Sequence, residues 1–401
     1  MLDWLIVGGG IHGTHLSMVL REAGVREAAI RVLDPWEEPL DRWTTLTGRT
    51  GMSFLRSPGV HHIGLDPYDL FRFAGRRRAR ARRYYHGRYR RPSLELFQAH
   101  ARDRISETGV ADLRVRGQAQ GLDRIRSGYR IDTEQGGIEA RRVVLSLGAP
   151  APAPEPPWSR QLRDGGVPVR HLFELEAGVD RLLQSPPGRD ASVAVLGGGI
   201  SAAQVALRLL REGRRVVLVS RHGLRIQAFD SAPGWLGPKY LREFHRRRCP
   251  RERREQIQAA RSGGSIPEEV AGALRAAAVR GEITLCTGVV VGVDCLQPGR
   301  GILHLTQGHH GSHRVEVQAV LLATGWDNAP PGTPWLPRAA DALGLRTAPC
   351  GHPIPDPGLR WASGLYVMGA LAELEVGPVS RNIAGARIAA ARIGEGAADP
   401  P

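Results

Sequence analysis

Two stretches of the chain repeat one pattern of strand, glycine turn and helix. Residues 3–20 read DWLIVGGGIHGTHLSMVL, and residues 192–210 read SVAVLGGGISAAQVALRLL. Each begins with an apolar, β-branched run that is typical of a buried strand and continues into an apolar pattern of helical period. The glycines between them allow a tight turn and let the backbone approach a pyrophosphate at the helix N-terminus. The repeat therefore predicts an α/β chain with two dinucleotide-binding sites.

The first copy suits a dinucleotide whose adenosine ribose carries free hydroxyl groups. Gly8, Gly10 and Gly13 have the spacing G-x-G-x-x-G, in which the third glycine lets the helix pack on the strand. The next apolar strand ends at Asp34, 21 residues past Gly13, where a carboxylate accepts hydrogen bonds from a ribose. These four residues are predicted to bind the first cofactor.

The second copy differs at the position that discriminates between nucleotides. Gly197 and Gly199 repeat the first two glycines, but the strand that follows ends at Arg221 instead of an acid. A carboxylate there repels a 2'-phosphate, whereas an arginine pairs with one. Ser201 stands at the expected helix N-terminus, where its hydroxyl caps the helix or meets a phosphate. Gly197, Gly199, Ser201 and Arg221 thus predict an NADPH site.

Further apolar strands mark the ends of the two nucleotide-binding segments. The runs RRVVLSLGAP (141–150) and QAVLLATGWD (318–327) each end a buried strand at a glycine, and a proline-rich linker follows the first. They predict two Rossmann-like dinucleotide-binding domains, the second inserted into the first. The expected boundaries are 1–155 for the first domain with an insertion at about 40–95, 160–317 for the second, and 318–401 for the return to the first.

Composition narrows the class of protein. A chain of 401 residues with 42% hydrophobic residues suits two globular domains, and no run of 18 apolar residues predicts a membrane span. The first strand begins at once and leaves no room for a signal peptide, so a cytoplasmic protein is expected. The four cysteines form no C-x-x-C, which argues against a zinc ribbon and a dithiol relay, and no metal site is predicted.

The net charge of +15 raises the question of nucleic-acid binding. The densest basic run, GRRRARARRYYHGRYRRP at 75–92, suits either a phosphate-binding patch with stacking tyrosines or a solvated insertion. Lys239 is the only lysine, so the arginine excess follows coding bias as readily as selection for binding, and no nucleic-acid fold signature accompanies the run. We favour a mobile surface insertion at 76–91 and no nucleic-acid partner.

The arrangement resembles the flavoprotein monooxygenases with two dinucleotide-binding domains. Within that group, residues 52–99 resemble the lysine and ornithine N-monooxygenases, because SFL at 53–55 and RPSLELFQAH at 91–100 match family segments. DRWTT at 41–45 resembles the family's tryptophan-containing FAD loop. The resemblance implies FAD at the first fingerprint with Trp43 beside it, NADPH at the second, and a flavin hydroperoxide that oxygenates an amine nitrogen.

The resemblance also implies a flavin-ring site and a substrate ligand. Gly369, Pro378 and Val379 lie in the C-terminal segment that would meet the flavin ring, where a helix from about Pro378 would stabilise negative charge. Arg56 stands where the family has a substrate-contacting lysine, and its planar fork suits bidentate recognition of a carboxylate. Arg56 is therefore the predicted catalytic-site residue. Glu373 and Glu375 are expected to be ordinary polar loop residues.

Three functions remain open at this stage. The favoured one is an FAD- and NADPH-dependent monooxygenase that N-hydroxylates an amine or amino acid with molecular oxygen, because the chain has no dithiol to receive electrons. The second is a flavin oxidoreductase that passes electrons from NAD(P)H to a quinone or a protein. The third is a non-catalytic or nucleic-acid-binding flavoprotein. Neither the substrate nor the oligomeric state follows from these motifs.

Overall fold

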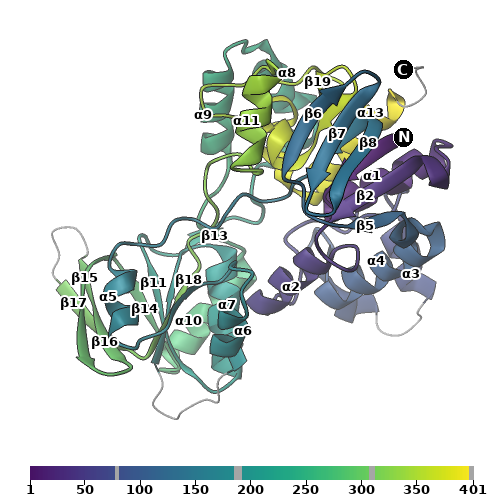
Figure 1. The fold of residues 1–401 in the computed structure, drawn as a ribbon. Coiled ribbons are helices and arrows are strands. Elements are labelled where there is room, and N and C mark those ends of the chain that lie inside the picture. Colours follow the sequence, from purple (N-terminus) through teal and green to yellow (C-terminus); the bar gives the residue numbers. More distant parts are fainter. Residues whose placement is uncertain (77–80, 185–191, 307–311, 397–401) are drawn as a thin grey trace.

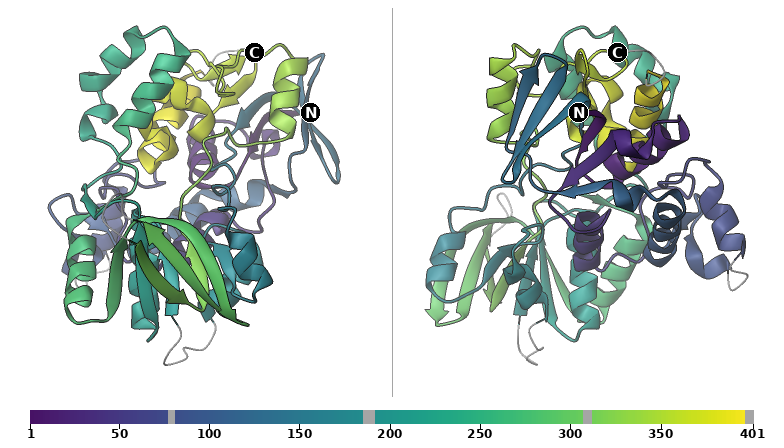
Figure 2. Two further views of the ribbon diagram at one scale, coloured as in Figure 1. Left: turned by 90° about the vertical axis from the view of Figure 1, so that its left-hand side faces the viewer. Right: turned by 45° about the vertical axis from the view of Figure 1, so that its right-hand side comes forward.

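The chain forms two lobes in the computed structural model, which describes residues 1–76, 81–184, 192–306 and 312–396 (Figure 1). The first lobe contains the N-terminal strand and the last helix, α13 (Ile383–Glu395), side by side. The second lobe contains the second fingerprint. Figure 2 shows the same two lobes from two further directions.

The first lobe is built on an eight-stranded sheet with a parallel centre. β1 (Leu2–Val7) lies between β2 (Ile30–Asp34) and β8 (Gly136–Leu145). β5 (Arg114–Arg116) pairs with β2, and β20 (Leu365–Val367) pairs with β8. Antiparallel strands complete it: β6 (Gly121–Ile125), β7 (Gly128–Thr133) and β19 (Arg360–Ala362). The last four residues of β1 are buried, as a continuous apolar run predicts for the centre of a parallel sheet.

The second lobe repeats this strand order. β10 (Ser192–Leu196) lies between β11 (Arg215–Ser220) and β18 (Ala319–Leu322), flanked by β14 (Ile283–Thr287) and β9 (Val169–His171). The parallel order β14-β11-β10-β18-β9 thus corresponds strand for strand to β5-β2-β1-β8-β20. A separate antiparallel sheet joins β15 (Val289–Gln297), β16 (Arg300–Thr306) and β17 (Ser312–Val317). The predicted fold class, two Rossmann-like domains in an α/β chain, is confirmed.

A helix follows each glycine turn. α1 (Ile11–Glu22) follows β1, and α7 (Ile200–Arg211) follows β10. Gly24, with a φ of 90°, adopts the left-handed conformation that ends α1. The other helices used below are α2 (Asp41–Thr50), α3 (Asp69–Arg76), α4 (Leu94–Thr108), α8 (Pro238–Arg246), α9 (Pro250–Ala260), α10 (Glu268–Val279) and α12 (Glu373–Val376). Within the described residues, none of the helices is both long and apolar enough to cross a bilayer.

The predicted domain boundaries need two corrections. β18 pairs with β10 and β9, so the second domain extends past residue 318 and the return to the first begins after Leu322. The segment 233–260, expected in the second domain, forms the α8–α9 hairpin, whose buried Trp235, Phe244 and Ile257 belong to the core of the first lobe. Figure 1 shows α8 and α9 beside that lobe. The sequence does not indicate that this hairpin packs in the first lobe, because the residues that its side chains contact lie far away along the chain.

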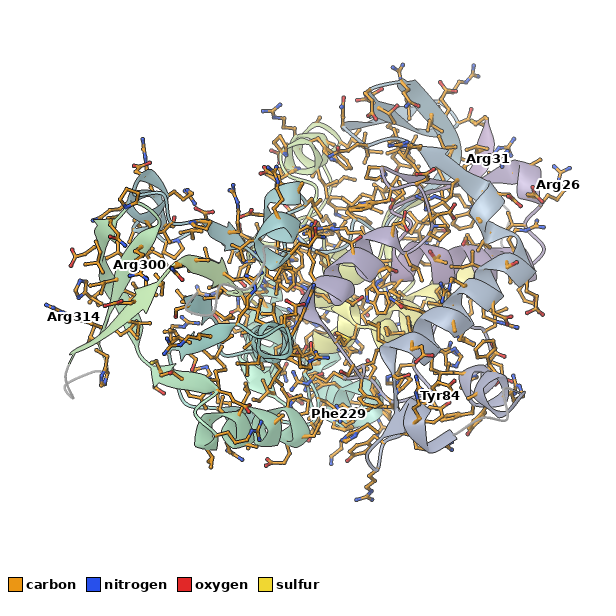
Figure 3. The ribbon with its side chains drawn as sticks, turned by 90° about the horizontal axis from the view of Figure 1, so that it is seen from below. Arg26, Arg31, Tyr84, Phe229, Arg300 and Arg314 are labelled. Atoms are coloured by element: carbon orange, nitrogen blue, oxygen red, sulfur yellow. The ribbon has the colours of Figure 1, made fainter. Side chains whose placement is uncertain are left out.

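The described part of the basic run packs against the second lobe. Residues 77–80 lie outside the described residues. Beyond them, the rings of Tyr89 and Phe229 are 4.7 Å apart, and Arg91 forms an ion pair with Glu269 on α10. Figure 3 places Tyr84 and Phe229 along the same side of the molecule. The run was expected to be a mobile surface insertion, but Tyr89 and Arg91 contact the other lobe.

Candidate functional site

Steric constraints fix the glycines of the first turn. Gly8 has a φ of 111°, and a Cβ there would clash with the carbonyl of Ser146 at the end of β8. A Cβ on Gly13 would clash with the carbonyl of Gly8, so the third glycine brings α1 close to the strand. By contrast, a Cβ on Gly10 would have nothing within 4 Å. The turn therefore has a tight base and an open face at the start of α1, as a bound diphosphate requires.

Asp34 lies at the end of β2, as predicted, and holds the turn in place. Its carboxylate accepts hydrogen bonds from the N–H of Gly9 and, at 2.9 Å, from the N–H of Trp36. Arg114 of β5 donates to it at 3.3 Å. A carboxylate has about four acceptor positions, so one remains for a ribose hydroxyl. Asp34 can thus organise the turn and bind a nucleotide at the same time.

Two arginines beside this turn escaped the sequence analysis. Arg114 reaches over Gly9, and its buried Nη1 has no hydrogen-bond partner among the described residues. Arg42, the second residue of α2, also has a buried Nε without a described partner, and burial lowers its pKa. A buried N–H group without an acceptor is costly, and the oxygens of a diphosphate would supply the acceptors that Arg42 Nε and Arg114 Nη1 lack. The donor set therefore fits FAD. In a chain so rich in arginine, no local signal distinguishes these two.

The C-terminal segment meets the start of α1. Ser380 donates from Oγ to the carbonyl of Gly369 at 2.6 Å, and the Nε2 of His12 donates to the carbonyl of Ser380 at 2.9 Å. The structure thus brings Gly369 and residues 378–380 to the first glycine turn. One detail of the prediction is wrong: Pro378 begins a short 3-10 turn, η6 (Pro378–Arg381), and the long helix α13 begins only at Ile383.

His12, in the first turn of α1, is a further residue beside the first glycine turn. Burial lowers the pKa of its ring, which stays neutral. Because a carbonyl only accepts, the Nε2 bonded to Ser380 carries the proton, and Nδ1 is left as an acceptor. A Cβ on Gly369 would lie 3.6 Å from this ring.

Trp43, predicted to lie near the flavin, packs on Phe97 of α4 with ring centroids 4.9 Å apart.

The second glycine turn has the same construction. A Cβ on Gly197 would clash with the carbonyl of Ala323, which follows β18 as Ser146 follows β8. Around Gly199 the nearest atom to such a Cβ is the Cα of Gly264, at 3.7 Å. Ser201 lies half-buried in the first turn of α7, and Arg221 is exposed directly after β11. The predicted NADPH residues therefore gather at one edge of the second sheet.

Arg56 is not placed as the sequence predicts. Its Nη2 donates at 2.8 Å to the carbonyls of Gln227 and Phe229, and at 2.9 Å to the hydroxyl of Ser265. Its Nε donates at 3.3 Å to the carbonyl of Ala228. These contacts occupy the edge of the guanidinium group that a substrate carboxylate would use. Arg56 instead connects the first lobe to the loop 227–229 of the second.

Glu373 is also not the polar loop residue that was expected. Its side chain is completely buried and contacts four basic side chains. Glu375 is buried as well, and Arg253 of α9 donates to it at 3.1 Å. The prediction failed because the basic partners of Glu373 come from three separate segments: Arg254 and Arg261 at α9, His352, and Arg381 of η6.

Comparison with known proteins agrees with this architecture. No protein-family model and no curated protein matches the chain. An ornithine N-hydroxylase from Kutzneria sp. 744, solved with reduced FAD, NADP+ and L-ornithine, is 17% identical over 99% of both chains, with a TM-score of 0.75. An L-lysine 6-monooxygenase from Pseudomonas syringae is 20% identical over 100% of both, with a TM-score of 0.72. A cadaverine monooxygenase from Erwinia amylovora, bound to FAD, is 17% identical over 97% of this chain and 93% of its own, with a TM-score of 0.71. At these identities the likeness establishes the fold alone.

Proposed function

We propose that the protein is an FAD-dependent, NADPH-using monooxygenase that N-hydroxylates an amine. The observation that carries the proposal is the match along nearly the whole chain to three structures of enzymes named for lysine, ornithine and cadaverine. Two complete glycine turns with opposite charges at the discriminating position, Asp34 and Arg221, support it. So does the S-F-L segment at 53–55.

The proposal assigns each cofactor to one turn. FAD would be held by Gly8, Gly10, Gly13, Asp34, Arg42, Trp43, Arg114, Gly369, Pro378 and Val379, and NADPH by Gly197, Gly199, Ser201 and Arg221. FAD, when bound, accepts a hydride from NADPH and activates oxygen for transfer to the amine. The chain itself supplies position, charge and exclusion of water.

Three features of the chain serve this reaction. The cations of Arg42 and Arg114 would balance the diphosphate. Pro378, Val379 and Ser380, in the turn after Gly377, are buried, which would keep water from the ring. His12 is neutral and offers an acceptor at Nδ1, which suits holding an N–H or O–H group beside the turn. All four cysteines are free, and three are exposed, so no protein dithiol stands ready to take electrons.

The proposal is tested with purified protein and a panel of amines. We expect about one FAD per chain, and NADPH consumption that produces hydroxylamine in equal amount with at least one of L-lysine, L-ornithine, cadaverine and putrescine. Hydroxylamine, hydrogen peroxide and NADPH are measured together. Turnover that yields only peroxide with every amine, together with rapid anaerobic reduction of a quinone, would move the protein to the oxidoreductase class.

A further inference from the structure

Three arginines converge on one buried carboxylate where the lobes meet. Glu373 contacts Arg254 through Oε1, while Oε2 lies 2.8 Å from Arg261 Nη2 and 3.0 Å from Arg381 Nε. His352 Nε2 lies 3.1 Å from Oε1. We call Arg254, Arg261 and Arg381 the arginine cluster.

Positive charge exceeds negative charge in this cluster. Burial lowers the pKa of His352 to about 3, so this histidine is neutral at pH 7 and adds no cation. Glu373 supplies one negative charge, and Asp230 acts on Arg261 and Arg381 as a second. One guanidinium charge remains in excess. Desolvation lowers the pKa of Arg261 to about 9, the direction expected of a cation short of compensating charge.

Two members of the cluster have a buried nitrogen without a hydrogen-bond partner in the described part of the chain, Arg381 Nη2 and Arg254 Nη1. Arg254 Nη1 contacts Glu373 Oε1, whereas Arg381 Nη2 has no acceptor among the described residues. Arg254, by contrast, also donates to the carbonyl of Asn328 at 3.0 Å, and its side chain is only 7% exposed. The side chains of Arg261 and Arg381 are 18% and 24% exposed, so they are less enclosed than that of Arg254. A buried donor without an acceptor is unfavourable, and an anionic oxygen would satisfy it.

The cluster lies between the two proposed cofactor sites. Arg261 donates from Nε to the carbonyl of Pro378 at 3.3 Å, on the flavin side. Three residues later, the Cα of Gly264 is 3.7 Å from the position of a Cβ on Gly199, in the second glycine turn. The segment 261–264 therefore runs from one site to the other. An anion held by Arg261 and Arg381 would lie where the substrate must meet both cofactors.

We propose that Arg261 and Arg381 bind the carboxylate of the substrate, which makes an amino acid, and not a diamine, the preferred amine. This inference rests on the proposed function and narrows its substrate class. Glu373 holds the two guanidinium groups in one orientation, and their remaining N–H groups form a fork for a carboxylate. Arg56 is then a positioning residue, because it holds the loop 227–229 that leads to Asp230 and the neighbouring Ser265.

Matched substrate pairs separate the carboxylate from the amine. Cadaverine and putrescine are L-lysine and L-ornithine without the carboxylate. Binding of each to the oxidised holoenzyme is measured by calorimetry, and KM and kcat are measured by hydroxylamine formation. In the wild type we expect the amino acids to bind more tightly than the diamines. Arg381→Gln should weaken amino-acid binding and raise KM about 10- to 150-fold, with kcat largely kept and the diamines changed by less than about 3-fold.

Two more variants control for a merely structural effect. Arg381→Lys keeps the charge but not the fork, so its amino-acid KM should fall between those of the wild type and Arg381→Gln. If Arg381→Gln does not retain FAD, the comparison of substrates is made with Arg381→Lys instead. Arg253→Gln removes the neighbouring arginine that pairs with Glu375 and should not change the ratio of amino-acid to diamine binding.

Four results would overturn the assignment. Equal wild-type affinity for diamines and amino acids would remove the carboxylate from recognition. Equal weakening of both by Arg381→Gln would make the cluster structural. A higher dissociation constant for NADP+ with unchanged amine binding would assign the cluster to a nucleotide phosphate. Hydroxylation of diamines alone would refute this inference and agree with the proposed function. Binding of amino acids without hydroxylation would refute the proposed function and agree with this inference.

Discussion

At the scale of single residues, the two nucleotide sites differ most at the ends of β2 and β11. Asp34 is buried and already bonded to its turn, so its role is partly structural. Arg221 is exposed and has no hydrogen bond or ion pair with any described residue. It is therefore free to pair with a 2'-phosphate, and its removal should affect nucleotide choice without affecting the fold.

Arg221→Ala should lower kcat/KM for NADPH about 10- to 150-fold, because a hydrogen bond to a charged group contributes about 1.5–3 kcal/mol. The kcat/KM for NADH should change by less than about 3-fold. Both are measured from initial rates of nucleotide oxidation. Arg215→Ala, at the opposite end of β11, is the matched control and should leave the ratio unchanged. Equal use of both nucleotides by the wild type would mean that Arg221 does not read the phosphate.

At the scale of elements, the α8–α9 hairpin is the main departure from a simple insertion of one domain in another. Phe244 is fully buried and meets Trp235 edge to face, at 5.8 Å and 89°. Both belong to the core of the first lobe although the surrounding sequence belongs to the second. The hairpin also carries Arg253 and Arg254 to the C-terminal segment. It should therefore be stable only together with the first lobe.

Two large-to-small variants test that assignment. Phe244→Ala should destabilise the first lobe by about 3–5 kcal/mol and lower the temperature at which flavin is released. Leu274→Ala on α10, fully buried in the core of the second lobe, is the matched control. It should weaken NADP+ binding and leave flavin release nearly unchanged. Thermal scans of flavin fluorescence and NADP+ titrations give the two readouts. Loss of NADP+ binding without earlier flavin release in Phe244→Ala would assign the hairpin to the second lobe.

The elements also show where sequence reasoning succeeds. Gly8, Gly13 and Gly197 were predictable because a side chain at any of them would strike backbone. The pair of Arg261 and Glu373 was not predictable, because 112 residues separate its members and an arginine-rich chain offers many equivalent partners. Arg56 is a different case. It stands at a position that matches a family segment, but that match did not predict which groups its side chain contacts.

At the scale of the whole molecule, basic charge is spread over both lobes. Figure 3 places Arg26 and Arg31 near one end and Arg300 and Arg314 at the other. The lobes are joined by arginines that donate across the boundary, as Arg49 does to Asp180 at 2.8 Å and Arg208 to the carbonyl of Arg49 at 3.0 Å. Some of the arginines that contribute to the net charge of +15 thus connect the two lobes.

Buried histidines give the whole molecule a marked sensitivity to acid. Burial lowers the pKa to about 4 for His15 and His171 and to about 3 for His62 and His352. An unfolded histidine titrates near 6.5. As pH falls from about 6.5 to about 4, the unfolded chain therefore binds protons that the folded chain cannot, and stability falls. Above about 6.5 these groups are neutral in both states and have no effect.

The expected slope is large. Near pH 5, four such histidines correspond to nearly four protons taken up on unfolding, or about 5 kcal/mol of lost stability per pH unit. That is comparable to the whole stability of many domains, so the holoenzyme should unfold between about pH 5 and pH 4. Urea unfolding at pH 7, 6 and 5 measures the slope. His171→Asn should lower the slope by about one proton. Constant stability between pH 7 and pH 5 would show that these histidines accept protons without unfolding.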